Sequence, residues 1–86
     1  MRVIKEYELK LGMNKIQMNG SGNVLTAGSH NGKPCVWVEI DNDEIEEVGV
    51  AFMVASTDRE LEDMGALNYL GACETADGVV HIFEVL

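Results

Sequence analysis

Few side chains of this 86-residue sequence have the chemistry expected of a catalytic or metal site. The two histidines, His30 and His81, are not spaced with the acidic residues as metal ligands usually are. The segment Ser56-Thr57-Asp58 offers two hydroxyls and a carboxylate, but its spacing from either histidine does not match a nucleophile, base and acid arrangement. We therefore predict no catalytic residue, no metal ligand and no cofactor.

Aromatic and basic side chains favour binding over catalysis. An aromatic face stacks on a planar group such as a nucleobase, although a lone tryptophan within a strand is more often part of a core. An arginine or lysine side chain meets the phosphate of such a ligand. The candidate ligand-binding residues are Trp37, Arg59, Lys33, Tyr7, Tyr69, Arg2, Ser56 and Thr57.

The composition describes a small acidic domain. Fifteen acidic residues face six basic ones, and the formal net charge of −9 excludes general binding to a nucleic-acid backbone. The charge is unevenly distributed, because residues 1–38 hold five bases and two acids whereas residues 39–86 hold one base and thirteen acids. An anionic ligand would therefore be met by the N-terminal strands or by Arg59.

Length and hydropathy indicate one domain over residues 1–86 and no membrane contact. No apolar run approaches the 18 residues of a membrane-spanning helix, and the alternating start MRVIKEYELK does not resemble the apolar core of a signal peptide. The two cysteines, Cys35 and Cys73, form neither a C-x-x-C pair nor a disulfide framework. We expect a cytoplasmic protein.

Short apolar runs separated by turn residues predict a mainly β domain, built as a small antiparallel sheet, sandwich or barrel-like fold. At most one short helix is expected near residues 57–64, where Thr57 and Glu60 have the spacing of a capping box. Asn31-Gly32 and Asp77-Gly78 predict two hairpins. The run over 48–56 predicts a strand buried on both faces. The predicted strands span residues 2–9, 14–18, 24–30, 35–40, 48–56, 66–73 and 79–86.

The last of these strands is apolar on both faces. Val79, Phe83 and Val85 alternate with Val80, Ile82 and Leu86, and a sheet in a chain this short normally exposes one side to water. A second copy of the chain would cover the other side, which predicts a homo-oligomer. The candidate interface residues are Val80, Ile82, Phe83 and Leu86.

Three motifs carry a resemblance to a known family over nearly the whole chain. They are an N-G-x-P-C-x-W hairpin over residues 31–37, a Y-L-G step over residues 69–71 and a closing V-H-I-F-E over residues 80–84. With these motifs the chain resembles a family of short phage and prophage proteins that is known as a domain of unknown function. Where that family commonly has a Gly-Thr-Gly-like loop, this chain has Ser56-Thr57-Asp58-Arg59. The resemblance implies a viral accessory protein that acts in the host cytoplasm.

Two classes of function agree with these features. The first is an oligomeric, non-enzymatic binding protein that sequesters a nucleotide-type immune signal of the host. The alternative is an acidic inhibitor that binds a host defence protein such as a CRISPR effector, since residues 39–47 hold six acids and residues 58–63 hold four more. A virion or assembly accessory protein is a further alternative that the sequence leaves open.

Overall fold

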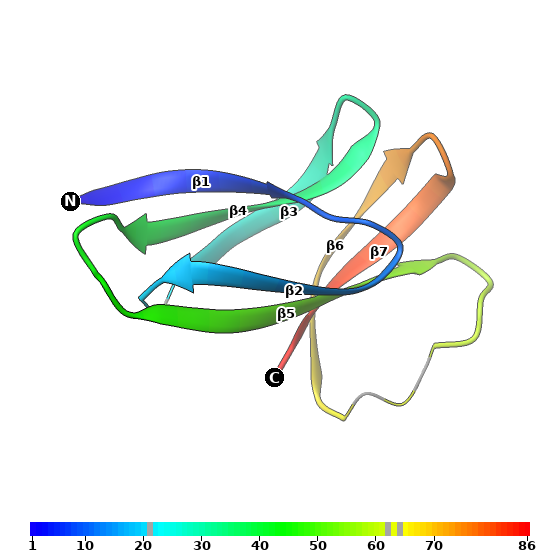
Figure 1. The fold of residues 1–86 in the computed structure, drawn as a ribbon. Coiled ribbons are helices and arrows are strands. Elements are labelled where there is room, and N and C mark those ends of the chain that lie inside the picture. The colour runs from blue at the N-terminus through cyan, green and yellow to red at the C-terminus, as the bar shows by residue number, and fades with distance from the viewer. Residues whose placement is uncertain (21, 62, 64) are drawn as a thin grey trace.

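The computed structural model describes residues 1–20, 22–61, 63 and 65–86, and these form seven antiparallel β-strands (Figure 1). The mainly β fold predicted from the sequence is confirmed, and each predicted strand has an observed counterpart. The strands are β1 (Arg2–Glu8), β2 (Gly12–Asn19), β3 (Asn23–His30), β4 (Lys33–Asp41), β5 (Glu47–Ser56), β6 (Leu67–Thr75) and β7 (Gly78–Val85).

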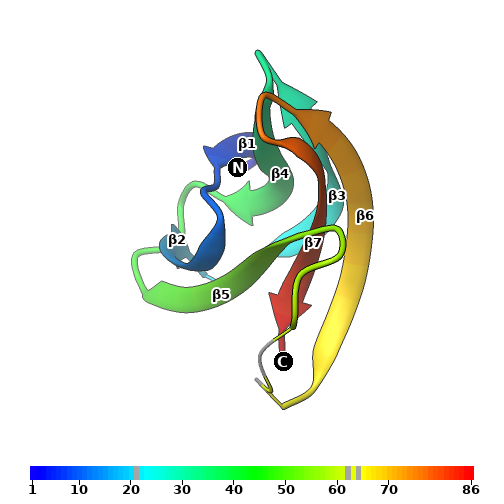
Figure 2. The ribbon, with the colours of Figure 1, turned by 90° about the vertical axis from the view of Figure 1, so that its right-hand side faces the viewer.

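The strands form two sheets that face each other. One sheet has the order β1-β4-β3 and the other has the order β2-β5-β7-β6. Figure 2 shows β3 and β6 running side by side, so that the sandwich is closed along this side. The turns of the β3–β4 and β6–β7 hairpins also meet, because the Ala76 amide donates a hydrogen bond of 3.1 Å to the Gly32 carbonyl.

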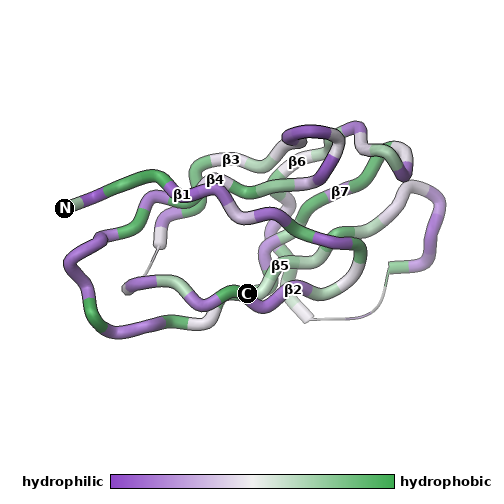
Figure 3. Tube along the Cα trace, turned by 45° about the horizontal axis from the view of Figure 1, so that its top comes forward, coloured by the Kyte–Doolittle hydropathy of each residue, from purple (hydrophilic) through white to green (hydrophobic). Residues whose placement is uncertain are grey.

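The core lies between the sheets and follows the alternation of each strand. Val36, Val38 and Ile40 point inward from β4, and Phe52 and Val54 point inward from β5. These inward-facing side chains are removed from water, which supplies most of the driving force for folding. Figure 3 shows that the hydrophobic residues gather in strands such as β7, whereas the connection between β4 and β5 is mainly hydrophilic.

The inner face of β7 corrects the predicted interface. Val80 and Ile82 are about 1% and 0% exposed and belong to the core of the single chain. Two of the four candidate interface residues are therefore covered by the opposite sheet and not by a second copy. Phe83 is half-buried on the other face of β7, and Leu86 follows the strand and is exposed.

Both predicted hairpins form. Asn31 and Gly32 have φ values of 55° and 76°, the left-handed conformation that a two-residue hairpin turn requires and that these two residue types tolerate. Thr75 lies opposite Gly78, so β6 and β7 are joined by an equally tight turn. The cysteines are both free thiols, and burial raises the pKa of each.

The helical turn predicted near residues 57–64 is absent from the described part of that segment. Glu62 and Met64 of this prediction lie outside the described residues. Ser21, which belongs to the predicted turn over 19–23, also lies outside them. The physical reason for the missing helical turn is the role of Thr57. Its amide and its hydroxyl both donate to the Val79 carbonyl of β7, at 3.3 and 3.2 Å, so the hydroxyl is not free to cap a helix. Asp58 then adopts a φ of 65°, which turns the chain out of the sheet. The described residues contain no helix that is long and apolar enough to cross a membrane.

Candidate functional site

The structure divides the eight candidate ligand-binding residues between the two sheets. Ser56, Thr57 and Arg59 lie where β5 runs into the β5–β6 connection, and Tyr69 lies on β6 of the same sheet. The other four belong to the opposite sheet, namely Arg2 and Tyr7 of β1 and Lys33 and Trp37 of β4.

The strand register places Tyr69 on the outer face of this sheet, whereas Ser56 lies opposite the core residue Val80. Ala55 lies opposite His81, and Phe83 lies opposite both Met53 of β5 and Tyr69 of β6. Residues directly opposite in antiparallel strands point to the same side, and the neighbours of these residues in sequence fill the core. His81, Phe83 and Tyr69 therefore form one outward-facing cluster beside the β5–β6 connection.

Hydrogen bonds fix the imidazole of His81 from both sides. Its Nδ1 lies 3.0 Å from the Tyr69 hydroxyl, and its Nε2 lies 2.9 Å from the Thr57 hydroxyl. The Thr57 hydroxyl has a second neighbour in the Val79 carbonyl at 3.2 Å, and one arrangement of the protons has Thr57 donating to Val79, Nε2 donating to Thr57 and Tyr69 donating to Nδ1. These groups form a continuous hydrogen-bonded chain across three segments of the sheet.

The Tyr69 ring is held in place and remains accessible. It meets Phe83 edge-on at a centroid distance of 5.2 Å and an interplanar angle of 65°, while its centroid lies 6.0 Å from that of His81. The residue is 53% exposed. An aromatic ring whose orientation is already fixed loses little conformational entropy when a planar ligand stacks on it.

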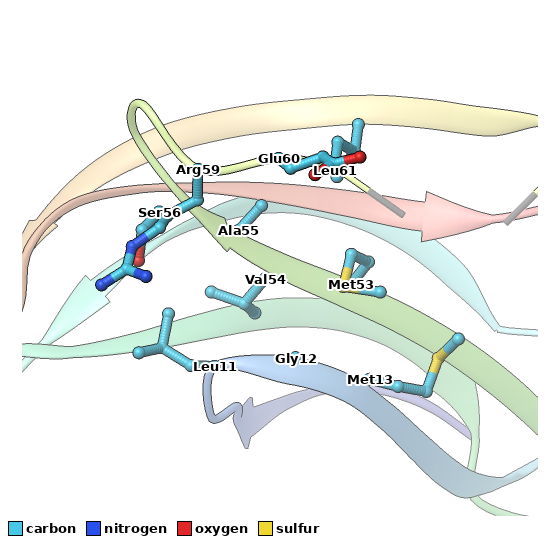
Figure 4. Close-up of a pocket in the computed structure, with 10 residues that line it drawn as sticks. All are labelled: Leu11, Gly12, Met13, Met53, Val54, Ala55, Ser56, Arg59, Glu60 and Leu61. Atoms are coloured by element: carbon cyan, nitrogen blue, oxygen red, sulfur yellow. The ribbon is translucent and has the colours of Figure 1, made fainter. Parts of the chain in front are cut away.

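Two adjoining pockets follow the β5–β6 connection. One has a volume of about 190 Å³ and is lined by His81, Phe83 and residues 55–59 and 61. The other, of about 380 Å³, lies between the connection and residues 11–13 before and within β2 (Figure 4). We call the two together the loop groove, because they share four lining residues, which are Ala55, Ser56, Arg59 and Leu61.

Arg59 is the basic residue that lines both parts of the loop groove. Figure 4 shows its guanidinium beside Ser56, at the end of the pocket where Leu11 lies. Among the described residues, no carboxylate oxygen is within 4.0 Å of its nitrogen atoms. The walls around it combine apolar side chains, such as Met53 and Leu61, with the polar residues Ser56 and Glu60. An arginine beside apolar side chains is suited to bind an anion that also carries an apolar or planar part.

The basic residues of the other sheet are already paired. Arg2 donates to Glu39 at 2.9 Å, and this contact raises the pKa of the guanidinium. Lys33 Nζ lies 3.6 Å from a carboxylate oxygen of Glu8. Both cations are thus neutralised locally by strand neighbours. The expectation that Arg2 or Lys33 would meet the same ligand as Arg59 is not supported by their placement.

The aromatic residues of that sheet are placed apart from each other. Tyr7 is half-buried and packs against the core, and burial raises the pKa of its hydroxyl. Trp37 is half-buried on the opposite side of the sheet, where its ring lies over Gly28 of β3. Neither residue lines the loop groove with Arg59.

A third pocket of about 420 Å³ lies where the β1–β2, β3–β4 and β6–β7 connections converge. Its two bases, Lys10 and Lys33, are balanced by two acids, Glu8 and Asp77. The loop groove is lined by one base, Arg59, and two acids, Asp58 and Glu60, but among the described residues Arg59 has no carboxylate oxygen within 4.0 Å, whereas Lys33 of the third pocket is paired with Glu8. Among the described residues, no group of three or more histidine, cysteine or acidic side chains is placed to hold a metal ion.

Sequence reasoning missed His81 and Phe83 as members of a ligand site and assigned Phe83 to a subunit interface. The alternation of the last strand shows that the two share a face. It does not show that Thr57, 24 residues earlier, would lie within hydrogen-bond distance of His81. The signal that was missing is the pairing of β5 with β7, which joins segments far apart in the sequence.

Comparison with known proteins yields one family. A family model described as "Domain of unknown function (DUF7352)" matches residues 1–86, the full extent of the fold described above. The expectation of a domain of unknown function is confirmed at that level. No curated protein and no solved structure matches the chain.

Proposed function

The chain belongs to the DUF7352 family, and from its structure we propose that it is a non-enzymatic binding protein that captures a small nucleotide-type anion in the loop groove. The observation that carries the proposal is the position of Arg59 between the two parts of the groove, close to an aromatic cluster. Arg59 binds the phosphate, and the base stacks on the exposed Tyr69 ring.

The charge of the chain makes this position significant. With fifteen acidic residues, most of the surface repels an anion. A guanidinium in a partly enclosed, partly apolar groove supplies directed hydrogen bonds to phosphate oxygens, and such contacts strengthen where water is excluded. The acidic surroundings, including the neighbours Asp58 and Glu60, reject anions that do not also fill the groove.

The hydrogen bonds of Thr57 favour binding without catalysis. A hydroxyl nucleophile donates its proton to the imidazole that activates it. The Thr57 hydroxyl has the Val79 carbonyl as a second acceptor at 3.2 Å, and the imidazole of His81 is engaged on its other side by Tyr69. Thr57 and His81 serve as a rigid part of the groove wall, and Tyr69 supports the imidazole of His81 from its other side.

The biological role that we propose is the sequestration of a nucleotide immune signal by a phage-encoded protein in the host cytoplasm. Its support is the resemblance of the sequence to short phage and prophage proteins, together with a groove that suits a phosphate and a planar base. A binding protein of this type needs no catalytic group, because tight capture alone lowers the free concentration of the signal.

An acidic mimic of nucleic acid has weaker support. Such a mimic needs a continuous acidic surface, yet the β4–β5 connection and the β5–β6 connection, which carry the acidic segments, lie at opposite ends of the molecule in Figure 1. We therefore retain this alternative only as an outcome of the test.

Calorimetry of the purified protein against AMP, ADP-ribose and cyclic dinucleotides tests the proposal directly. We expect heat of binding and a raised melting temperature with at least one of them. An absence of both heat and thermal shift across the whole panel overturns the proposed function. Capture of a host protein that is lost at high salt, in the same absence, supports the acidic mimic instead.

Arg59→Ala is expected to weaken the binding of the active nucleotide by at least about tenfold, because a hydrogen-bonded contact to a charged group contributes about 1.5–3 kcal/mol. The matched control is Lys5→Ala, which removes the same charge from an exposed position on β1. Equal weakening by both variants shows that general electrostatics, and not the loop groove, determines the affinity.

Tyr69 separates stacking from hydrogen bonding. Tyr69→Phe keeps the ring and loses the hydroxyl that contacts His81, whereas Tyr69→Ala removes the stacking surface as well. We expect Tyr69→Ala to weaken binding by roughly tenfold, from a stacking contribution of about 1–3 kcal/mol per base, and Tyr69→Phe to change it much less. Equal losses in titration calorimetry would mean that the ring does not stack on the ligand.

A further inference from the structure

β1 is an edge strand whose outer side has no partner strand among the described residues. Its pairing with β4 shows which backbone groups are free. The Met1 carbonyl accepts from the Asn42 amide, and the Leu9 amide donates to the Pro34 carbonyl, both at 2.8 Å. The register between these two contacts is unbroken. Because hydrogen-bonded pairs alternate along an antiparallel ladder, the odd residues of β1 bond to β4.

The even residues therefore direct their amide and carbonyl groups to the open side. They are Arg2, Ile4, Glu6 and Glu8, and their side chains share the outer face of the sheet. Ile4 is 64% exposed there. An open strand edge beside an exposed isoleucine is a template for pairing with another strand.

We propose that β1 pairs antiparallel with β1 of a second copy of this chain, about a two-fold axis that lies midway between the two copies of Ile4. The two three-stranded sheets then merge into one continuous sheet. This interface lies on the sheet opposite the loop groove and does not depend on the proposed function.

The sequence of β1 favours this register over those centred on Lys5 and Glu6. A two-fold axis normal to the sheet lies midway between the two β1 strands and places one residue directly opposite its own copy. Each register is named by that central residue. Centred on Lys5, it places two lysines opposite each other, and centred on Glu6, it places two glutamates opposite each other. Centred on Ile4, it pairs Ile4 with itself and places Arg2 opposite Glu6 of the second copy, twice. Opposite charges and apolar pairs stabilise cross-strand neighbours, whereas like charges destabilise them.

The contacts within one chain leave room for these pairs. Arg2 is bonded to Glu39 through one nitrogen, and its guanidinium has further donors for a second carboxylate. Glu6 contacts His30 through one of its two oxygens. The three opposed pairs add about six backbone hydrogen bonds, two for each pair. β1 carries two basic and two acidic residues, so this edge is not part of the acidic excess of the chain.

Light scattering during size-exclusion chromatography tests the dimer. We expect the mass of two chains for the unmodified protein. Ile4→Pro should give the mass of one chain with an intact fold by circular dichroism, because it removes an amide that points away from β4. The proposal is overturned if the unmodified protein keeps the mass of one chain at concentrations up to about 1 mM. A dissociation constant of about 1 mM corresponds to a binding free energy near −4 kcal/mol.

Charge exchange tests the register even if Ile4→Pro disturbs folding. Arg2→Glu should weaken dimerisation by about tenfold or more, because the new glutamate at position 2 then lies opposite Glu6 of the second copy on each side of the axis. Adding Glu6→Arg to that variant should restore the affinity, whereas adding Glu8→Arg should not. A role of these residues only within one chain predicts no rescue, since neither Arg2–Glu39 nor Glu6–His30 is rebuilt by the exchange. Rescue by Glu8→Arg in place of Glu6→Arg contradicts the register centred on Ile4.

Discussion

Ile82→Asp is expected to unfold the protein. Ile82 is 0% exposed and lies opposite Val54 and Gly71 in the middle of its sheet, and the buried side chains of the surrounding core cluster are apolar. Burying an unpaired charge costs several kcal/mol, which is comparable with the total stability of a small domain of about 5–15 kcal/mol. Circular dichroism should show loss of the β-sheet signal and of a cooperative melting transition.

Val79→Asp is the matched control for that experiment. It makes a similar change three residues earlier on the same strand, where Val79 is 46% exposed on the outer face. We expect its melting temperature to stay close to that of the unmodified protein. A folded Ile82→Asp protein with an unchanged melting temperature would contradict the position of Ile82 in the core. Ile82 was a candidate interface residue by its sequence pattern, and the structure places it in the core of the single chain instead.

Gly22→Ala is expected to destabilise the protein by about 1–3 kcal/mol, the usual cost of an added methyl group in a packed region. A Cβ atom at this position would lie 2.6 Å from Cγ1 of Val38 and 2.7 Å from Sδ of Met18. Met18 can adjust its flexible side chain, but Val38 is β-branched and fully buried. The melting temperature should fall by roughly 5–20 °C, since 1 kcal/mol corresponds to about 4–8 °C in a domain of this size.

Gly49→Ala tests whether that effect comes from crowding or from the loss of glycine. A Cβ atom at Gly49 of β5 would lie 3.3 Å from the Nε2 atom at the end of the exposed Gln17 side chain, which can move away. We expect little change or a small gain in stability, because glycine weakens a strand interior. Equal losses for both variants would show that close packing around Gly22 is not the cause.

The strands and hairpins were predictable from local patterns. Asn31-Gly32 specifies a tight turn because both residues tolerate a positive φ, and the alternation on either side defines the paired strands. The run over 48–56 is buried on both faces only at its centre, where Phe52, Met53 and Val54 are buried in succession, whereas Gly49 is exposed. The helical turn near Thr57 was not predictable, because the contact that prevents it comes from Val79 of β7.

In the candidate site, too, the chemistry of the residues was predictable from the sequence, whereas their placement was not. Sequence patterns identified Arg59, Ser56, Thr57 and Tyr69 as binding residues by their chemistry, together with four others that the fold places elsewhere. The sequence contains no local signal that distinguishes the two sets. Arg2 and Lys33 have the same charge as Arg59, but β1 and β4 bring carboxylates beside them.

The sequence by itself determined that this chain forms an acidic, mainly β domain with seven strands and two tight hairpins, because those features depend on neighbouring residues. Only the tertiary structure decided which apolar face of β7 is the core, which basic residue lies in a groove and which strand edge stays open. These outcomes depend on the pairing of β5 with β7 and on the order β1-β4-β3. Such pairings bring together residues that are distant in the sequence, and a local pattern of side chains does not encode its partner.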